Sequence, residues 1–123
     1  MTIIDANYIL RWFLGDVPVQ ASVVERLLTS SEPESIIIDR VTIAEVTYVL
    51  RAKGYDHKQI YTIFEELLYH ASVVPLSNAE AAALRLYADS LLDFEDCLLI
   101  ARAKTQHYQL GTFDKQMLNH MKE

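Results

Sequence analysis

Short runs of β-branched residues alternate along the chain with longer stretches in which apolar residues recur every third or fourth position. Runs of the first kind are typical of buried strands, and they occur at 2–5, 35–38 and 73–75, with a weaker candidate at 108–110. Stretches of the second kind predict amphipathic helices, which we expect at 6–14, 17–29, 42–54, 56–70, 77–88, 93–106 and 114–123. Because helices separate the strands, we predict an α/β fold in which a small parallel sheet of about four strands is flanked by about seven helices.

The composition is that of a soluble globular domain. The 123 residues suit one domain, so we expect residues 1–123 to fold as a single unit. Apolar residues make up 51% of the chain and charged residues 23%, which argues against disorder. The apolar runs are too short to span a bilayer, and a single cysteine, Cys97, cannot form an internal disulfide. We therefore expect a cytoplasmic protein without a membrane partner.

The net charge narrows the class of nucleic-acid partner. Seventeen acidic and eleven basic residues give a formal net charge of −6. This balance excludes a protein that coats nucleic acid with a basic surface. It does not exclude a nucleic acid held through bridging metal ions, so the positions of the acidic residues decide the question.

Several acidic residues are expected at the carboxyl edge of the predicted sheet, where open parallel sheets bind ligands. Asp5 ends the first strand, and Glu45 lies in the first turn of the helix after the second strand. Asp96 lies in the first turn of the helix that leads to the last strand candidate, with Asp93 one turn away, and Asp114 follows that candidate. Like charges this close repel one another, and a hard divalent cation such as Mg²⁺ or Mn²⁺ is the usual counter-charge.

A purely structural interpretation of the same acids is also available. Thr42-x-x-Glu45 matches a capping box, and Asp93 and Asp114 can each be the N-cap of a helix. Taken singly, such acids are more often caps than catalytic groups. Asp5 has fewer structural explanations, because it closes a buried strand, although it too can cap the following helix.

Five segments, in order along the chain, resemble the PIN domains, in particular the VapC-like toxins of bacterial toxin–antitoxin pairs. They are IIDANYILR at 3–11, LGD at 14–16 followed by Pro18 and Gln20, TIAEV at 42–46, DFEDCLLIA at 93–101 and TFDK at 112–115. The resemblance covers nearly the whole chain. The family usually has a further strand after the last helix, which the sequence here does not include.

The resemblance implies a three-layer α/β/α fold and a Mg²⁺-dependent endoribonuclease, with Mn²⁺ as a substitute. By position, Asp5 and Asp96 match the principal metal ligands and catalytic acids of the family. Glu45 and Asp114 match the supporting pair, and Asp93 is an additional acid at the rim that could also bind the metal.

Four further residues are candidates for substrate binding. Asn7 could form a hydrogen bond in the pocket, and Thr112 matches a small hydroxyl residue that accompanies the last acid of the family. Arg11 and Lys115 are placed near the predicted edge and could contact phosphates, although both could equally be ordinary surface charges. The resemblance further implies an RNA substrate, a cognate antitoxin protein as partner and a homodimer.

Two other classes of protein remain open at this stage. One is a non-catalytic PIN-like module whose acids only cap helices and whose surface binds a protein. The other is a phosphatase of the haloacid-dehalogenase type, which needs a second Asp two residues after the first. Asn7 stands at that position, so the phosphatase carries little weight.

Overall fold

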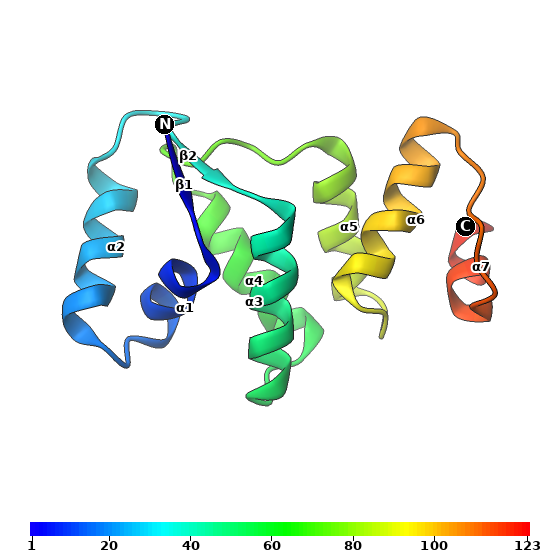
Figure 1. Cartoon of the computed structure of the whole chain (residues 1–123), viewed down its shortest axis with the longest axis horizontal. Helices are drawn as coiled ribbons and strands as arrows, with labels where there is room; N and C mark the ends of the chain where they lie inside the picture. The colour runs from blue at the N-terminus through cyan, green and yellow to red at the C-terminus, as the bar shows by residue number, and fades with distance from the viewer.

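A parallel two-stranded sheet forms at one side of the molecule. The computed structural model describes residues 1–123 and contains β1 (Thr2–Ile4) and β2 (Ile36–Ile38). The two strands are in register with Ile3 opposite Ile37, and Figure 1 shows them side by side near the N-terminus. Val73 adds a single parallel bridge to Ile36. The α/β fold with a parallel sheet is thus confirmed, with fewer strands than predicted.

The predicted strands at 73–75 and 108–110 do not form, so the expectation of about four strands is wrong. Val73 contributes only its one bridge to the edge of β2. After the sixth helix the chain turns sharply, because His107 adopts a left-handed conformation with φ of 58° and Tyr108 donates its N–H to the carbonyl of Ala103. Residues 108–110 therefore leave the helix as coil, in which Tyr108 is exposed and Leu110 packs against the core, and β1 has no second neighbour.

Seven helices carry most of the chain, as the apolar periodicity predicts. They are α1 (Ala6–Leu14), α2 (Pro18–Ser30), α3 (Arg40–Ala52), α4 (His57–Leu68), α5 (Asn78–Ala88), α6 (Phe94–Gln106) and α7 (Lys115–Met121). Side-chain caps fix several of their starts. Ser77 and Glu80 form the reciprocal capping box that begins α5, and an equivalent box begins α4.

The helix α3 begins two residues earlier than the sequence suggests. Its N-cap is Asp39, which accepts a hydrogen bond from the N–H of Val41. The predicted capping box of Thr42 and Glu45 therefore does not form. The hydroxyl of Thr42 instead donates to the carbonyl of Ile4 at 3.3 Å, which ties the start of α3 to the end of β1.

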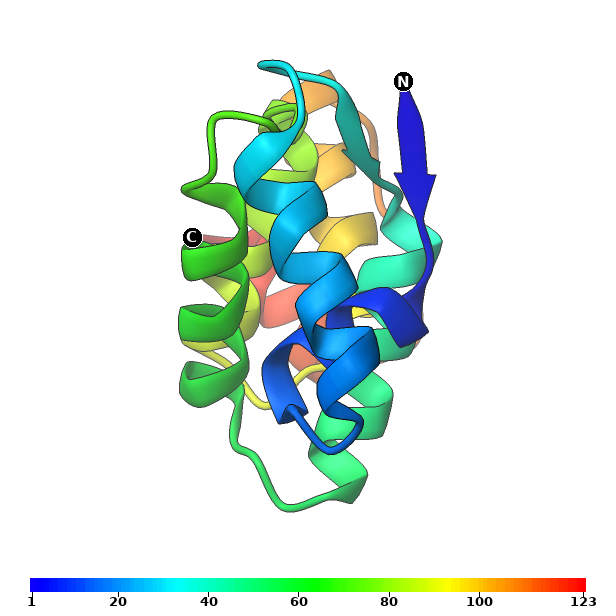
Figure 2. The same ribbon diagram turned by 90° about the vertical axis from the view of Figure 1, so that its left-hand side faces the viewer.

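The strands and helices share one apolar core of 25 buried residues. Ile4, Ile36 and Ile38 belong to this core, whereas the side chain of Ile3 on the other face of β1 is 65% exposed. Figure 2 shows α2 running in front of the core, with the strands along one edge of the molecule. None of the helices combines the length and hydropathy needed to cross a membrane. The carboxyl ends of β1 and β2 point toward α1 and α3, and this junction positions the candidate site.

Candidate functional site

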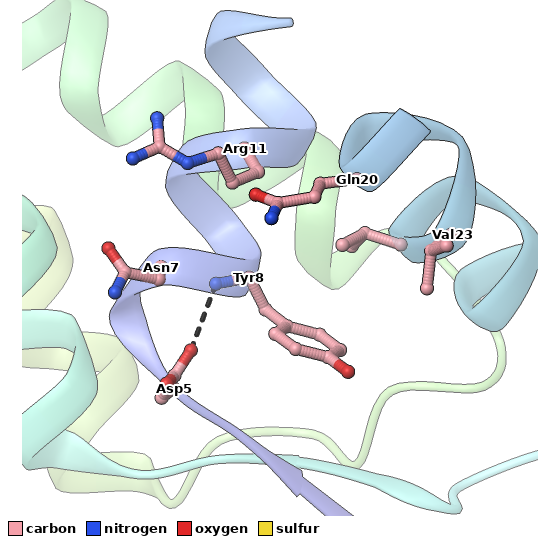
Figure 3. Close-up of a pocket in the computed structure, with 7 residues that line it drawn as sticks. Asp5, Asn7, Tyr8, Arg11, Gln20 and Val23 are labelled. Atoms are coloured by element: carbon pink, nitrogen blue, oxygen red, sulfur yellow. Dashed lines mark hydrogen bonds between the residues drawn. The ribbon is translucent and has the colours of Figure 1, made fainter. Parts of the chain in front are cut away.

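Asp5 occupies the junction between β1 and α1. It is exposed and serves as the N-cap of α1, where its Oδ1 accepts a hydrogen bond of 3.0 Å from the N–H of Tyr8 (Figure 3). This bond uses one carboxylate oxygen and leaves the other free for a ligand. The structural and the functional interpretation of Asp5 are therefore compatible.

Glu45 lies one helical turn after Thr42 on α3. Since Thr42 is bonded to Ile4 at the end of β1, Glu45 belongs to the same corner of the molecule as Asp5. Its side chain is exposed. No hydrogen bond or ion pair engages it, so this carboxylate has no structural role that the contacts reveal.

Asp96 is the half-buried acid of the site, in the first turn of α6. Burial raises the pKa of its carboxyl group, and the neighbouring charges of Asp93, Asp114 and Glu95 raise this pKa further. The first turn of a helix by itself favours a carboxylate. The raised pKa therefore means that burial and like-charge repulsion outweigh the helix dipole at this position.

Asp93 and Asp114 flank Asp96 with different local roles. Asp93 occupies the N-cap position of α6 but makes no side-chain capping bond, so its carboxylate is free. Asp114 caps α7 by accepting the N–H groups of Gln116 and Met117. The hydroxyl of Thr112 accepts the N–H of Asp114 at 3.0 Å and so fixes the approach to this cap. The capping interpretation thus holds for Asp114 and fails for Asp93.

The predicted acids divide into two groups. Asp93, Asp96 and Asp114 act on one another electrostatically, whereas Asp5 and Glu45 are not among the charges that perturb Asp96. Nowhere in the chain do three or more His, Cys, Asp or Glu side chains lie close enough to hold one metal ion together.

Two of the predicted substrate-binding residues line a cleft next to Asp5. Asn7 and Arg11 border an open cleft of about 460 Å³ between α1 and α2. Arg11 also donates to Asp16 at 2.6 Å, and this hydrogen bond lowers the pKa of the Asp16 carboxyl. Lys115, the first residue of α7, is exposed and next to Asp114, away from this cleft.

Gln20, Val23 and Val24 line the same cleft from α2. In the sequence, Gln20 stands out only as part of the family resemblance, and Val23 and Val24 only as apolar positions of a helix, so none of them was a predicted site residue. Their helix is amphipathic, and Val23 falls on the predicted apolar face together with Val24. The signal that could have revealed the cleft is an apolar face wider than the core needs. Val24 on this face is buried, whereas Val23 is 53% exposed.

Comparison with known families decides the classification. The family model of the PIN domain matches residues 2–123. The chain belongs to the PIN domain family. PIN domains are typically metal-dependent nucleases that act on nucleic acids. No match is found among curated proteins or among solved structures.

The donor chemistry of this PIN domain suits a divalent metal ion, since all five candidate ligands are carboxylates and hard cations prefer oxygen. A cation would also offset the repulsion that raises the pKa of Asp96. In this structure no three of these carboxylates lie close enough together to hold one ion. Binding of one ion by the full set would require the carboxylates to come closer than they lie here.

Proposed function

We propose that residues 1–123 form one PIN domain that hydrolyses RNA phosphodiester bonds with Mg²⁺, for which Mn²⁺ can substitute. The observation that carries the proposal is Asp96, a half-buried carboxylate whose pKa is raised by burial and by Asp93 and Asp114. A carboxyl group whose pKa is raised by burial and by neighbouring acids is a candidate functional residue. The nuclease character of the PIN family supports the same conclusion.

The acidic side chains would hold the metal and the polar residues would hold the substrate. Asp5 and Asp96 are proposed as principal metal ligands, Glu45 and Asp114 as supporting ligands, and Asp93 as an additional acid at the rim. A bound divalent ion supplies Lewis-acid polarisation of the scissile phosphate and lowers the pKa of a coordinated water. The products would carry 5′-phosphate and 3′-hydroxyl ends.

The remaining proposed roles concern orientation of the RNA. Asn7 and Arg11 would bind the substrate next to Asp5, and Lys115 would contact a phosphate beside Asp114. Thr112 would position Asp114 through the bond that it accepts from the Asp114 N–H. Because water is the nucleophile, the 2′-hydroxyl takes no part in the chemistry, and preference for RNA over DNA has to come from binding.

A direct assay tests the nuclease. The purified protein is incubated with single-stranded RNA and Mg²⁺, and the ends of the products are mapped. We expect cleavage that a chelator abolishes and that Asp96→Asn abolishes, while Ser77→Ala retains it because Ser77 only caps α5. Metal-independent cleavage, or full activity of Asp96→Asn, would refute the assignment.

A non-catalytic PIN-like binding module is the second candidate. The observations in its favour are that Asp5 and Asp114 both cap helices and that no three acids converge. Such a module would not be stabilised by Mn²⁺. Thermal melting with and without Mn²⁺ therefore separates the two functions.

The biological setting follows the resemblance to VapC-like toxins. We propose a cytoplasmic toxin of a type II toxin–antitoxin pair that acts as a homodimer and is neutralised by a cognate antitoxin lying across the acidic edge. Light scattering at micromolar concentration tests the dimer, and a monomeric mass would contradict it. A small neighbouring gene that encodes a DNA-binding protein, and whose product blocks cleavage, is the expected partner.

A further inference from the structure

The cleft between α1 and α2 has a composition that the acidic site does not explain. Its volume of about 460 Å³ lies within the range of about 300–1,000 Å³ that is usual for small-molecule sites. An aromatic ring, two aliphatic side chains, two amides and a guanidinium line it, together with Asp5.

Both walls of the cleft, α1 and α2, carry groups that a ligand can contact. Figure 3 shows the ring of Tyr8 and the side chain of Val23 in the space between α1 and α2, with the Gln20 amide extending from α2 toward α1. Tyr8 is 41% exposed and Val23 is 53% exposed, so both offer apolar surface to a ligand. A flat aromatic ligand could stack on the Tyr8 ring, and the Gln20 amide offers both donors and an acceptor to its edge.

The α1 wall of the same cleft also carries charged and polar groups. Asp5, Asn7 and Arg11 line the cleft together with Tyr8, and in Figure 3 they lie at its end farther from Val23. Arg11 has five N–H donors and uses Nη1 for Asp16, so other donors remain for an anion. One ligand that combines a flat polar-edged ring with an adjoining anion is a nucleotide.

From this arrangement we infer that the α1–α2 cleft holds one base of a single-stranded RNA, stacked on Tyr8 with its edge against Gln20, and that Arg11 receives the adjoining phosphate near Asp5. The inference rests on the proposed function for the identity of the substrate. It assigns a base-binding subsite to Tyr8 of α1 and Gln20 of α2, neither of which is an acid of the metal site. Stacking on a tyrosine tolerates every base, whereas the amide edge distinguishes among them.

Binding can be measured separately from cleavage. A short fluorescein-labelled single-stranded RNA of random sequence is titrated with protein in buffer containing Ca²⁺ in place of Mg²⁺, and intact RNA is verified on a gel. Tyr8→Ala should weaken binding by about 5- to 100-fold, the loss expected for one stacked base. Tyr8→Phe should bind like the wild type, because the ring is retained.

Matched controls address folding and charge. Tyr69→Ala removes a tyrosine that is 90% exposed and lies outside the cleft, and it should leave the RNA affinity unchanged. Val23→Glu places a negative charge in the cleft and should weaken binding, whereas Ser22→Glu adds the same charge at the neighbouring exposed position of α2, outside the cleft lining, and should weaken it far less. Val23→Glu keeps the test open if Tyr8→Ala does not fold.

The outcomes separate this inference from the proposed nuclease. Wild-type affinity in Tyr8→Ala and Val23→Glu, or equal losses in the cleft variants and their controls, would overturn the subsite even if the protein cleaves RNA. Absence of RNA binding by the wild type would overturn it as well. A change in oligomeric mass of Tyr8→Ala with unchanged RNA affinity would show that a second copy covers the cleft instead. RNA binding that depends on Tyr8 in a protein that never cleaves would support the subsite and refute the nuclease.

Discussion

Replacement of Asp96 by Asn distinguishes a metal ligand from an ordinary residue of a helix start. The Asp96 side chain accepts no backbone hydrogen bond in α6, so its favourable local contribution is limited to the helix dipole, about 0.3–1 kcal/mol. The raised pKa shows that burial, Asp93, Asp114 and Glu95 outweigh this contribution when the carboxyl is ionised. We therefore expect Asp96→Asn to leave the free energy of unfolding unchanged or to raise it at neutral pH, without metal.

The raised pKa of Asp96 also predicts how the free energy of unfolding changes with pH. Since the folded-state pKa of Asp96 lies above the unfolded value of about 3.8, the folded protein holds this proton more tightly. The contribution of Asp96 to stability is therefore lost as the pH rises from the unfolded pKa through the folded one. The difference in unfolding free energy between Asp96→Asn and the wild type should be smallest below this window and largest above it, measured by urea unfolding across the pH range.

Metal addition should reverse the order of the two proteins. Mn²⁺ at one hundred times its dissociation constant stabilises a binding protein by about 2.7 kcal/mol. This free energy corresponds to a rise of roughly 10 °C in melting temperature for a domain of this size. We expect that rise in the wild type and little or none in Asp96→Asn.

The reference variant is Ser77→Ala, which removes the side-chain cap of α5 and should cost about 1 kcal/mol. Its melting temperature should rise with Mn²⁺ as much as that of the wild type. The reasoning is refuted if Asp96→Asn melts lower than the wild type without metal and responds to Mn²⁺ in the same way.

Three further changes test other parts of the structure. Tyr87→Phe should raise the free energy of unfolding by about 1–3 kcal/mol in chemical denaturation, because the Tyr87 hydroxyl is buried without a hydrogen-bond partner; a loss of stability would contradict this. Burial raises the pKa of the Cys97 thiol to about 11, so a thiol reagent at pH 8 should modify Cys97 only after denaturant is added. Gly15→Ala should cost about 1 kcal/mol in thermal melting, because Gly15 ends α1 with φ of 63° although nothing lies near an added Cβ; an unchanged melting temperature would argue against this strain.

The sequence alone determined the helices and the family of this protein. Helix periodicity and caps depend on residues within about four positions of one another. The capping box at Ser77, the end of α1 at Gly15 and the start of α7 at Asp114 could therefore be predicted locally, and the structure has all three. The motifs that match the PIN domain are short local segments as well, and the family match confirms them.

The extent of the sheet required tertiary contacts. A strand of three residues gains almost nothing from its own propensity and exists only where a neighbour accepts its hydrogen bonds. β1 and β2 pair with each other, whereas 108–110 has no partner and remains coil. The start of α3 was decided in the same way, since the hydroxyl of Thr42 bonds to the distant carbonyl of Ile4 and Asp39 becomes the cap.

In the candidate site too, the sequence determined one part and the tertiary structure the other. The identity of its acids follows from the motifs, but the distances between them depend on how α6 packs against α3 and how α7 packs against α6. The structure brings Asp114 into the electrostatic range of Asp96 and leaves Asp5 outside that group. The cleft between Tyr8 and Gln20 exists only because α1 docks against α2. Local sequence fixes which side chains a helix carries, whereas the packing of the helices against one another decides which of those side chains meet.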